Sequence, residues 1–125
     1  MKGISPDVSV YLWQGAMDMR KSFDALSSFV AEQLGRNVIR EGVYVFFSRC
    51  RKRVKILYWD RDGYALWQKR LEAGSYRIER VDACEVVTSI DLESLLCGID
   101  FSRIKLRKNA ESGSYDSAGN AIKMA

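Results

Sequence analysis

Histidine is absent from the 125 residues of this chain, and cysteine is scarce. Without histidine, the chain cannot form Ser-His or Cys-His nucleophile pairs or histidine metal sites. The three cysteines, Cys50, Cys84 and Cys97, include no Cys-x-x-Cys spacing, so neither a disulfide framework nor a zinc knuckle is indicated. We expect the thiols to be reduced, two of them buried, and we predict no metal and no cofactor.

The sequence also lacks the usual enzyme signatures. No phosphate-binding P-loop, dinucleotide-binding glycine turn or nucleophile elbow occurs. Two carboxylate pairs are present, but Asp60 with Asp62 falls in a predicted turn, and Asp91 with Glu93 falls at a predicted helix start, where acids favour the helix dipole. Both pairs have a structural explanation, so we predict a protein that is not an enzyme.

Long apolar runs are missing as well. No stretch of about 18 uncharged apolar residues could cross a membrane, and residues 1–7 lack the apolar core of a signal peptide. We therefore expect a cytoplasmic protein without a membrane partner.

Basic and acidic residues are unevenly distributed along the chain. Residues 36–80 hold twelve Lys or Arg against five Asp or Glu, a local net charge of +7, whereas residues 81–100 hold five acids and no base. The basic region is a plausible electrostatic footprint for nucleic acid, although acidic proteins or anionic lipids would experience the same field.

The basic region centres on a predicted β-hairpin. Its strands, Val54–Trp59 and Tyr64–Leu71, are rich in β-branched and aromatic residues and flank the turn Asp60–Gly63. If Trp59 faces Tyr64, alternation separates two faces. The more apolar face, our predicted core face, comprises Val54, Ile56, Tyr58, Ala65, Trp67, Lys69 and Leu71. The other face comprises Lys55, Leu57, Trp59, Tyr64, Leu66, Gln68 and Arg70.

This second face combines aromatic residues near the turn with positive charge at the open end. Trp59, Tyr64 and Leu66 form the aromatic part, and Arg53 joins Lys55, Gln68 and Arg70 at the other end. Such a surface suits a polyanion. The alternative is that these cations only keep an exposed sheet soluble.

The remaining elements predict an α+β fold. An antiparallel β-sheet of about five strands is expected, with the helix near residues 22–34 packed on a face and a short C-terminal helix over residues 89–98, capped by Ser89. Further strands are predicted at residues 8–13, at 43–47 and, as an edge strand, at 75–81, while 82–89 fits either a short strand or an extended crossing. Residues 1–102 form the predicted domain, and the basic, then polar, tail 103–125 is predicted to be disordered.

Two cations stand at the start of the predicted main helix. The helix dipole disfavours positive charge at this end of a helix, an effect of about 0.3–1 kcal/mol for exposed charges. Arg20 and Lys21 should therefore destabilise the helix by a few tenths of a kcal/mol. This placement suggests a functional role, but an incidental exposed pair would look the same.

Several segments taken together resemble the small accessory protein, usually called TnpB, of the insertion-sequence sixty-six family of bacterial transposable elements. The segments run in order from about Trp13 to Phe101 and are specific in combination: Asp18–Leu26, Val45–Phe46, Arg53–Tyr64, Lys69–Gly74 and Leu95–Phe101. The chain departs from the family pattern at Tyr76–Arg80, where an aromatic stretch closed by tryptophan and proline is expected, and in its long polar tail. The resemblance implies a role in transposition beside a separate transposase that carries the catalytic acids, and it supplies no catalytic residue.

Two functions follow as hypotheses. In the first, a non-catalytic accessory protein binds DNA, at the element ends or target, through a basic aromatic hairpin. The candidate nucleic-acid-binding residues are Arg20, Lys21, Arg49, Arg51, Lys52, Arg53, Lys55, Trp59, Tyr64, Lys69 and Arg70. In the second, the chain is a protein adaptor that holds the transposase or another accessory subunit through its aromatic sheet and its acidic helix.

Overall fold

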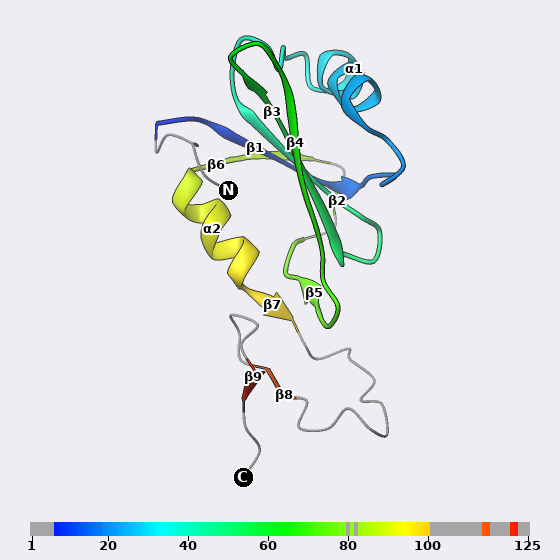
Figure 1. The fold of residues 1–125 in the computed structure, drawn as a ribbon, viewed down its shortest axis with the longest axis vertical. Helices are drawn as coiled ribbons and strands as arrows, with labels where there is room; N and C mark the ends of the chain where they lie inside the picture. The colour runs from blue at the N-terminus through cyan, green and yellow to red at the C-terminus, as the bar shows by residue number, and fades with distance from the viewer. Residues whose placement is uncertain (1–6, 80, 82, 101–113, 116–120, 123–125) are drawn as a thin grey trace.

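A computed structural model of the protein describes residues 7–79, 81, 83–100, 114–115 and 121–122 (Figure 1). The described elements in chain order are β1 (Val10–Ala16), α1 (Phe23–Gln33), β2 (Val43–Phe47), β3 (Arg53–Asp60), β4 (Gly63–Arg70), β5 (Ser75–Tyr76), β6 (Cys84–Val87), α2 (Ser89–Cys97), β7 (Ile99–Asp100), β8 (Ser114–Tyr115) and β9 (Ala121–Ile122). The predicted α+β class is confirmed, with one main helix and one short C-terminal helix.

The main sheet has five strands in the order β4-β3-β2-β1-β6. Strands β2, β3 and β4 form the predicted antiparallel meander, and Trp59 lies opposite Tyr64 as expected. One pairing differs from the antiparallel prediction, because β1 runs parallel to β2. Helix α1 supplies the crossover that a parallel connection requires, so the chain can return to the same end of the sheet before β2 begins.

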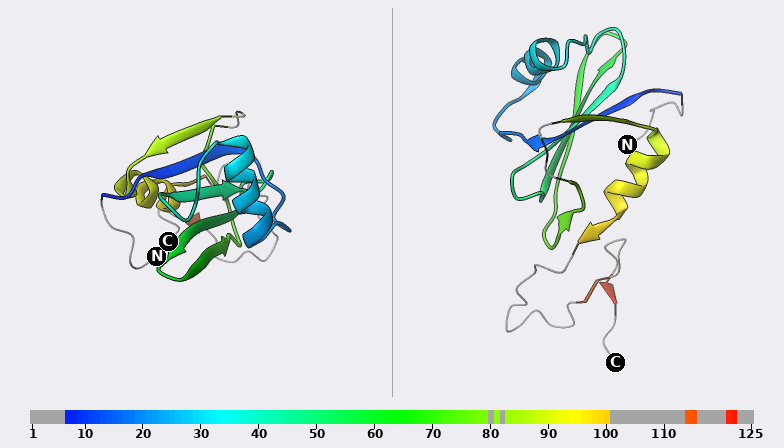
Figure 2. Two further views of the ribbon diagram at one scale, coloured as in Figure 1. Left: turned by 90° about the horizontal axis from the view of Figure 1, so that it is seen from above. Right: turned by 180° about the vertical axis from the view of Figure 1, so that it is seen from behind.

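Both faces of the sheet are covered, one by each helix (Figure 2). On the α2 face, Val54 and Ile56 join a core with Leu92 of α2, as the predicted core face requires. The opposite face is also core, which corrects the expectation of a largely exposed second face. There Leu57 is fully buried with Leu26 and Val30 of α1. The residues of β2 are buried from end to end because both helices pack over this central strand.

The predicted edge strand 75–81 is wrong. Among the described residues of this segment, only Ser75–Tyr76 is a strand, and it pairs with β7 in a separate two-stranded sheet. Gly74 with φ +77° turns the chain inward before it, and the Tyr76 ring packs 5.4 Å from the ring of Phe47. The edge strands of the main sheet are β4 and β6, and β6 lies within the segment for which the sequence left two interpretations open.

The helix boundaries follow the sequence closely. Helix α2 is capped by Thr88 and not by Ser89, because Thr88 and Asp91 form a reciprocal capping box. Helix α1 begins after Ser22, whose side chain makes no capping hydrogen bond, and it ends before Gly35, whose φ is +63°.

Three further predictions concern the thiols, the membrane and the tail. The cysteines are free as expected, but all three are exposed, so the prediction of two buried thiols is wrong. Cys50 lies in the turn between β2 and β3, Cys84 begins β6, and Cys97 ends α2, so none lies in the middle of a covered strand. In the described part of the chain, no helix is long and apolar enough to span a membrane. Most of the tail 103–125 lies outside the described residues, which include only the paired strands β8 and β9, so its disorder stays a prediction.

Candidate nucleic-acid interface

The β3–β4 hairpin brings four polar side chains together at its open end. Arg53 lies opposite Arg70, and Lys55 lies opposite Gln68, in the register that the alternating pattern predicts. Like charges placed directly opposite each other in a sheet are destabilising by up to about 1 kcal/mol. The pairing of two arginines is therefore unfavourable for folding unless an anion lies between or beside them.

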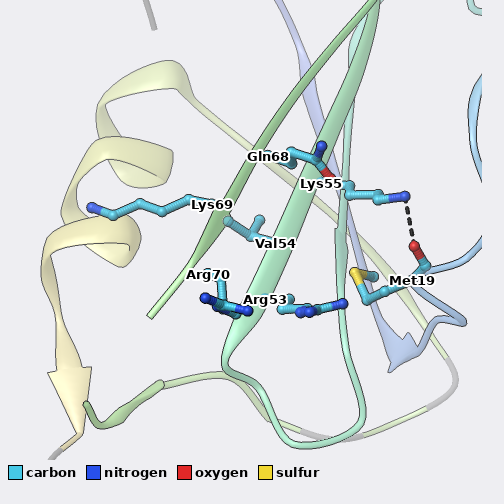
Figure 3. Close-up of a pocket in the computed structure, with 7 residues that line it drawn as sticks. All are labelled: Met19, Arg53, Val54, Lys55, Gln68, Lys69 and Arg70. Carbon is cyan, nitrogen blue, oxygen red and sulfur yellow. Dashed lines mark hydrogen bonds between the residues drawn. The ribbon is translucent and has the colours of Figure 1, made fainter. Parts of the chain in front are cut away.

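A hollow of about 260 Å³ opens at this end of the hairpin (Figure 3). Its lining consists of Met19, Arg53, Val54, Lys55, Gln68, Lys69 and Arg70. Figure 3 shows Arg53 extending toward Met19, whereas Lys69 extends in the opposite direction, toward the α2 side of the sheet. The Arg53 guanidinium therefore lies on the α1 side of the hollow.

Lys55 connects the hairpin to the segment that precedes α1. Its side chain is only 7% exposed, and its ammonium donates hydrogen bonds to the carbonyl oxygens of Met19 at 2.7 Å and Lys21 at 2.6 Å. Burial, followed by repulsion from Arg53, lowers the pKa of the Lys55 ammonium below its usual 10.5. Lys55 is therefore a positioning residue, and its ammonium is already occupied by backbone oxygens.

The Asp18–Lys21 loop lies at the hollow because Lys55 binds it there. The guanidinium of Arg20 is 91% exposed and forms a bidentate ion pair with Asp18, with N–O distances of 2.8 to 3.1 Å. This pair holds the pKa of the Asp18 carboxyl at about 2, chiefly through the side-chain hydrogen bond from Arg20. Arg20 is thus partly neutralised, whereas Lys21 has no ion pair among the described residues.

We use the name basic end for Arg53, Lys55, Gln68 and Arg70 together with the Asp18–Lys21 loop. Two segments more than thirty residues apart meet here through the Lys55 hydrogen bonds. Arg70 donates to Glu72 at 3.2 Å, but both side chains are well exposed, so this ion pair is weak. Within the described chain, Arg53 forms no ion pair.

The β2–β3 corner continues the positive surface beyond Arg53. Arg49 and Lys52 are exposed, and Arg51 is half-buried. Arg51 adopts φ +60° because the corner is closed by hydrogen bonds from its own amide to Ser48 and from the Tyr76 amide to its carbonyl. Its guanidinium reaches the Ile78 carbonyl at 3.5 Å. Arg51 consequently stabilises the corner, while its two exposed neighbours face solvent.

The aromatic pair lies at the other end of the hairpin. Trp59 and Tyr64 pack edge to face at 5.1 Å, and the indole N–H of Trp59 donates to the Arg61 carbonyl. Six residues separate Trp59 from Arg53 along β3, which corresponds to about 20 Å. The two rings are therefore separate from the basic end, although both lie on the α1 side of the sheet.

The structure thus divides the predicted site residues into groups. It brings together Arg20, Lys21, Arg53, Lys55 and Arg70, with Arg49, Arg51 and Lys52 on the adjoining corner. It separates the pair Trp59 and Tyr64 from this group. Lys69 lines the hollow, but its side chain extends toward the α2 side of the sheet. Sequence reasoning missed Met19 as part of the lining, and no local pattern identifies it.

The comparison with known proteins identifies the family. The family described as IS66 Orf2 like protein matches residues 8–106. The chain belongs to this family. The IS66 Orf2-like family is a family of transposition accessory proteins, as the sequence resemblance implied.

Two curated relatives of this IS66 Orf2-like chain come from Sinorhizobium fredii (strain NBRC 101917 / NGR234). Uncharacterized protein y4hO is 31% identical over 76% of this chain and 84% of its own length. Uncharacterized protein y4jC is 26% identical over 84% of this chain and 91% of its own length. No solved structure matches the chain at a significant level.

Proposed function

We propose that this IS66 Orf2-like chain is a non-catalytic accessory protein that binds DNA during transposition through its basic end. The observation that carries the proposal is the double hydrogen bond of Lys55, which fixes a cationic loop beside the arginines of the hairpin. The result is a positive hollow in which no lining residue is acidic. Phosphate contacts of this kind determine affinity and register but carry no direct sequence information.

The individual roles differ within the basic end. Arg53 and Arg70 are the proposed phosphate ligands, because both line the hollow and both are exposed. Lys21 and Lys52, in the adjoining segments, are proposed as further contacts. Lys55 holds the loop in place. A bound phosphate would also relieve the repulsion between the two opposed arginines.

Trp59 and Tyr64 have a separate proposed role. An aromatic edge-to-face pair at about 20 Å from the basic end would meet the same strand of nucleic acid about six nucleotides away, at 3.4 Å per nucleotide. Trp59→Ala should therefore weaken binding to single-stranded DNA more than to duplex DNA, since base stacking needs unpaired bases.

The test is a titration of fluorescently labelled element-end DNA at several salt concentrations. The double variant Arg53→Ala with Arg70→Ala should lose at least about tenfold in affinity at low salt, and its slope of log K against log salt should fall by about 1.8, at 0.9 per duplex phosphate contact. Arg40→Ala is the matched control, because Arg40 is an exposed cation that does not line the hollow. The control should retain most of the affinity.

Two results would overturn the DNA-binding proposal. One is the absence of binding at low salt by the unmodified chain. The other is equal loss of affinity in the double variant and in the Arg40→Ala control after correction for the number of charges removed. A metal-dependent nicking assay tests the non-catalytic part, and cleavage that disappears when Asp60 and Asp62 are replaced by Asn would contradict it.

A protein adaptor is the second candidate function, and a different surface favours it. The β6 strand lies at the opposite edge of the sheet from β4. Val86 is 60% exposed there, and Ile90, close after β6, is 69% exposed. Exposed apolar side chains of this size beside acids are typical of protein contact surfaces. Because the two surfaces are separate, one chain could contact DNA and the transposase together.

A further inference from the structure

The β6 strand presents an open edge of the main sheet. It is the last strand in the order β4-β3-β2-β1-β6, and within the described residues it pairs only with β1. Proteins usually protect such an edge with lysine, proline or a bulge. The sequence Cys84–Val87 contains none of these.

The register shows which backbone groups face the open edge. The Gln14 amide donates to the Ala83 carbonyl at 2.9 Å, so this opposed pair is hydrogen-bonded. Opposed pairs alternate between bonded and non-bonded in an antiparallel ladder. Glu85 therefore bonds toward β1, whereas Cys84 and Val86 direct their N–H and C=O groups outward, where an added strand could bind them.

A hollow of about 330 Å³ borders this edge on the α1 face. Its apolar part is formed by Tyr11, Trp13, Leu34 and Val86. Its single cation, Arg36, lies over the Tyr11 ring at 4.1 Å and forms an ion pair with Glu41 at 2.8 Å. The hollow can thus receive an apolar side chain from a strand paired with β6.

The other face of the same edge is acidic. Glu85 lies opposite Leu12, which belongs to the α2-side core, so it occupies the α2 face of β6. Asp91 and Glu93 are exposed on α2, which starts two residues after β6. No Lys or Arg occurs anywhere in residues 81–100. An added strand would therefore meet apolar surface on one side and negative charge on the other.

We propose that the β6 edge binds an extended segment of a partner protein in which basic and apolar residues alternate, by addition of that segment as a sixth strand. Its apolar residues occupy the hollow beside Val86, and its basic residues face Glu85, Asp91 and Glu93. A second copy of this edge is a poor occupant, because it would bring the same acids together. This inference rests on the adaptor function and is independent of DNA binding at the basic end.

The test uses the full chain and a synthetic peptide of alternating lysine and leucine, with binding measured by calorimetry. A peptide of equal composition with its leucines grouped together is the first control. Glu93→Lys with Glu85→Lys should weaken binding of the alternating peptide by at least tenfold. The grouped peptide should bind at least tenfold more weakly than the alternating peptide, because it cannot direct its apolar and basic residues to opposite faces.

The decisive variant is Val86→Pro. It removes an N–H group that faces outward and leaves the hydrogen bonds between β6 and β1 intact, a position that tolerates proline. Val86→Ala is its matched control, since it shortens the same side chain but keeps the N–H. Val86→Pro should abolish peptide binding, whereas Val86→Ala should weaken it only a fewfold, with thermal unfolding confirming that both variants fold.

Three results would overturn the inference. Equal binding of both peptides would show a nonspecific charge effect. Undiminished binding by a folded Val86→Pro variant would show that the peptide does not add as a strand to the open edge of β6. Sedimentation of the chain alone as a dimer that Val86→Pro dissociates would show that a second copy occupies the edge. DNA affinity, measured on Val86→Pro and Val86→Ala, should stay unchanged, so failure here is distinct from failure at the basic end.

Discussion

Replacement of Lys55 by Met tests the link on which the basic end depends. Methionine preserves most of the buried stem but removes the ammonium that donates to the carbonyls of Met19 and Lys21. Hydrogen bonds to a charged donor contribute about 1.5–3 kcal/mol each. Relief of the burial of the charge, which already lowers the Lys55 pKa, offsets part of this loss. We expect the free energy of unfolding to fall by about 2–4 kcal/mol.

The assay is urea unfolding at neutral pH, with Lys69→Met as the control. Lys69 is exposed and has no hydrogen bond or ion pair among the described residues, so its replacement should change the free energy of unfolding by less than about 0.5 kcal/mol. If both variants unfold alike, Lys55 does not hold the loop, and the basic end is not a preorganised surface. A marginal domain has only about 5–15 kcal/mol in total, so the expected loss is easily measured.

The same variant has a pH signature. Because the folded-state pKa of Lys55 lies below 10.5, the unfolded chain binds more protons between the two values, and this residue makes stability rise as the pH increases through that interval. Lys55→Met should remove this rise. The free energy of unfolding is measured by urea titration between pH 8 and about 10.5. If the ammonium were fully solvated, this free energy would change with pH in the same way in the unmodified chain and in Lys55→Met.

Three other predictions concern a glycine, an ion pair and a helix cap. Gly42→Ala should lower the free energy of unfolding, measured in urea, by about 2–4 kcal/mol. Gly42 has φ +88°, and an added Cβ would lie 2.6 Å from the ring of the buried Tyr11. Gly35→Ala should cost only about 1 kcal/mol, because Gly35 has φ +63° but open space around it. The pKa of the Asp18 carboxyl, measured by NMR, should be about 2 and should move toward 3.8 in Arg20→Ala. The contribution of this carboxyl to stability is present above pH 3.8 and should disappear as the pH falls toward 2. An unchanged pKa in the variant would contradict the ion pair. Thr88→Ala should destabilise the chain by about 1 kcal/mol, whereas Thr88→Ser should be nearly neutral, since serine also caps helices.

Local patterns in the sequence predicted the hairpin well. The turn composition of residues 60–63 sets the register, and strict alternation then determines which residues share a face. The open-end group of Arg53, Lys55, Gln68 and Arg70 follows directly from that register. The same is true of α2, whose leucines pack on the sheet as their spacing indicates.

Features that depend on distant contacts could not be predicted. Lys55 has the pattern of an exposed strand residue, and it is buried only because a loop more than thirty residues earlier passes over it. The second core beneath α1 has the same origin, since the position of α1 on the sheet is set by the parallel β1–β2 crossover. Ser75–Tyr76 left the main sheet because the Tyr76 ring packs on Phe47, a contact that periodicity does not encode.

The place of β6 beside β1 has a consequence for synthesis on the ribosome. The meander β2–β4 joins neighbours in the sequence, but the β1–β6 pairing closes a loop of about seventy residues, which makes it the slower contact. During translation, β1 can pair with β2 while β6 is still being made. The nascent chain therefore completes its basic end before its acidic edge exists. Until β6 is made, β1 is the edge strand, and its unpaired backbone groups can bind a chaperone or a neighbouring polypeptide.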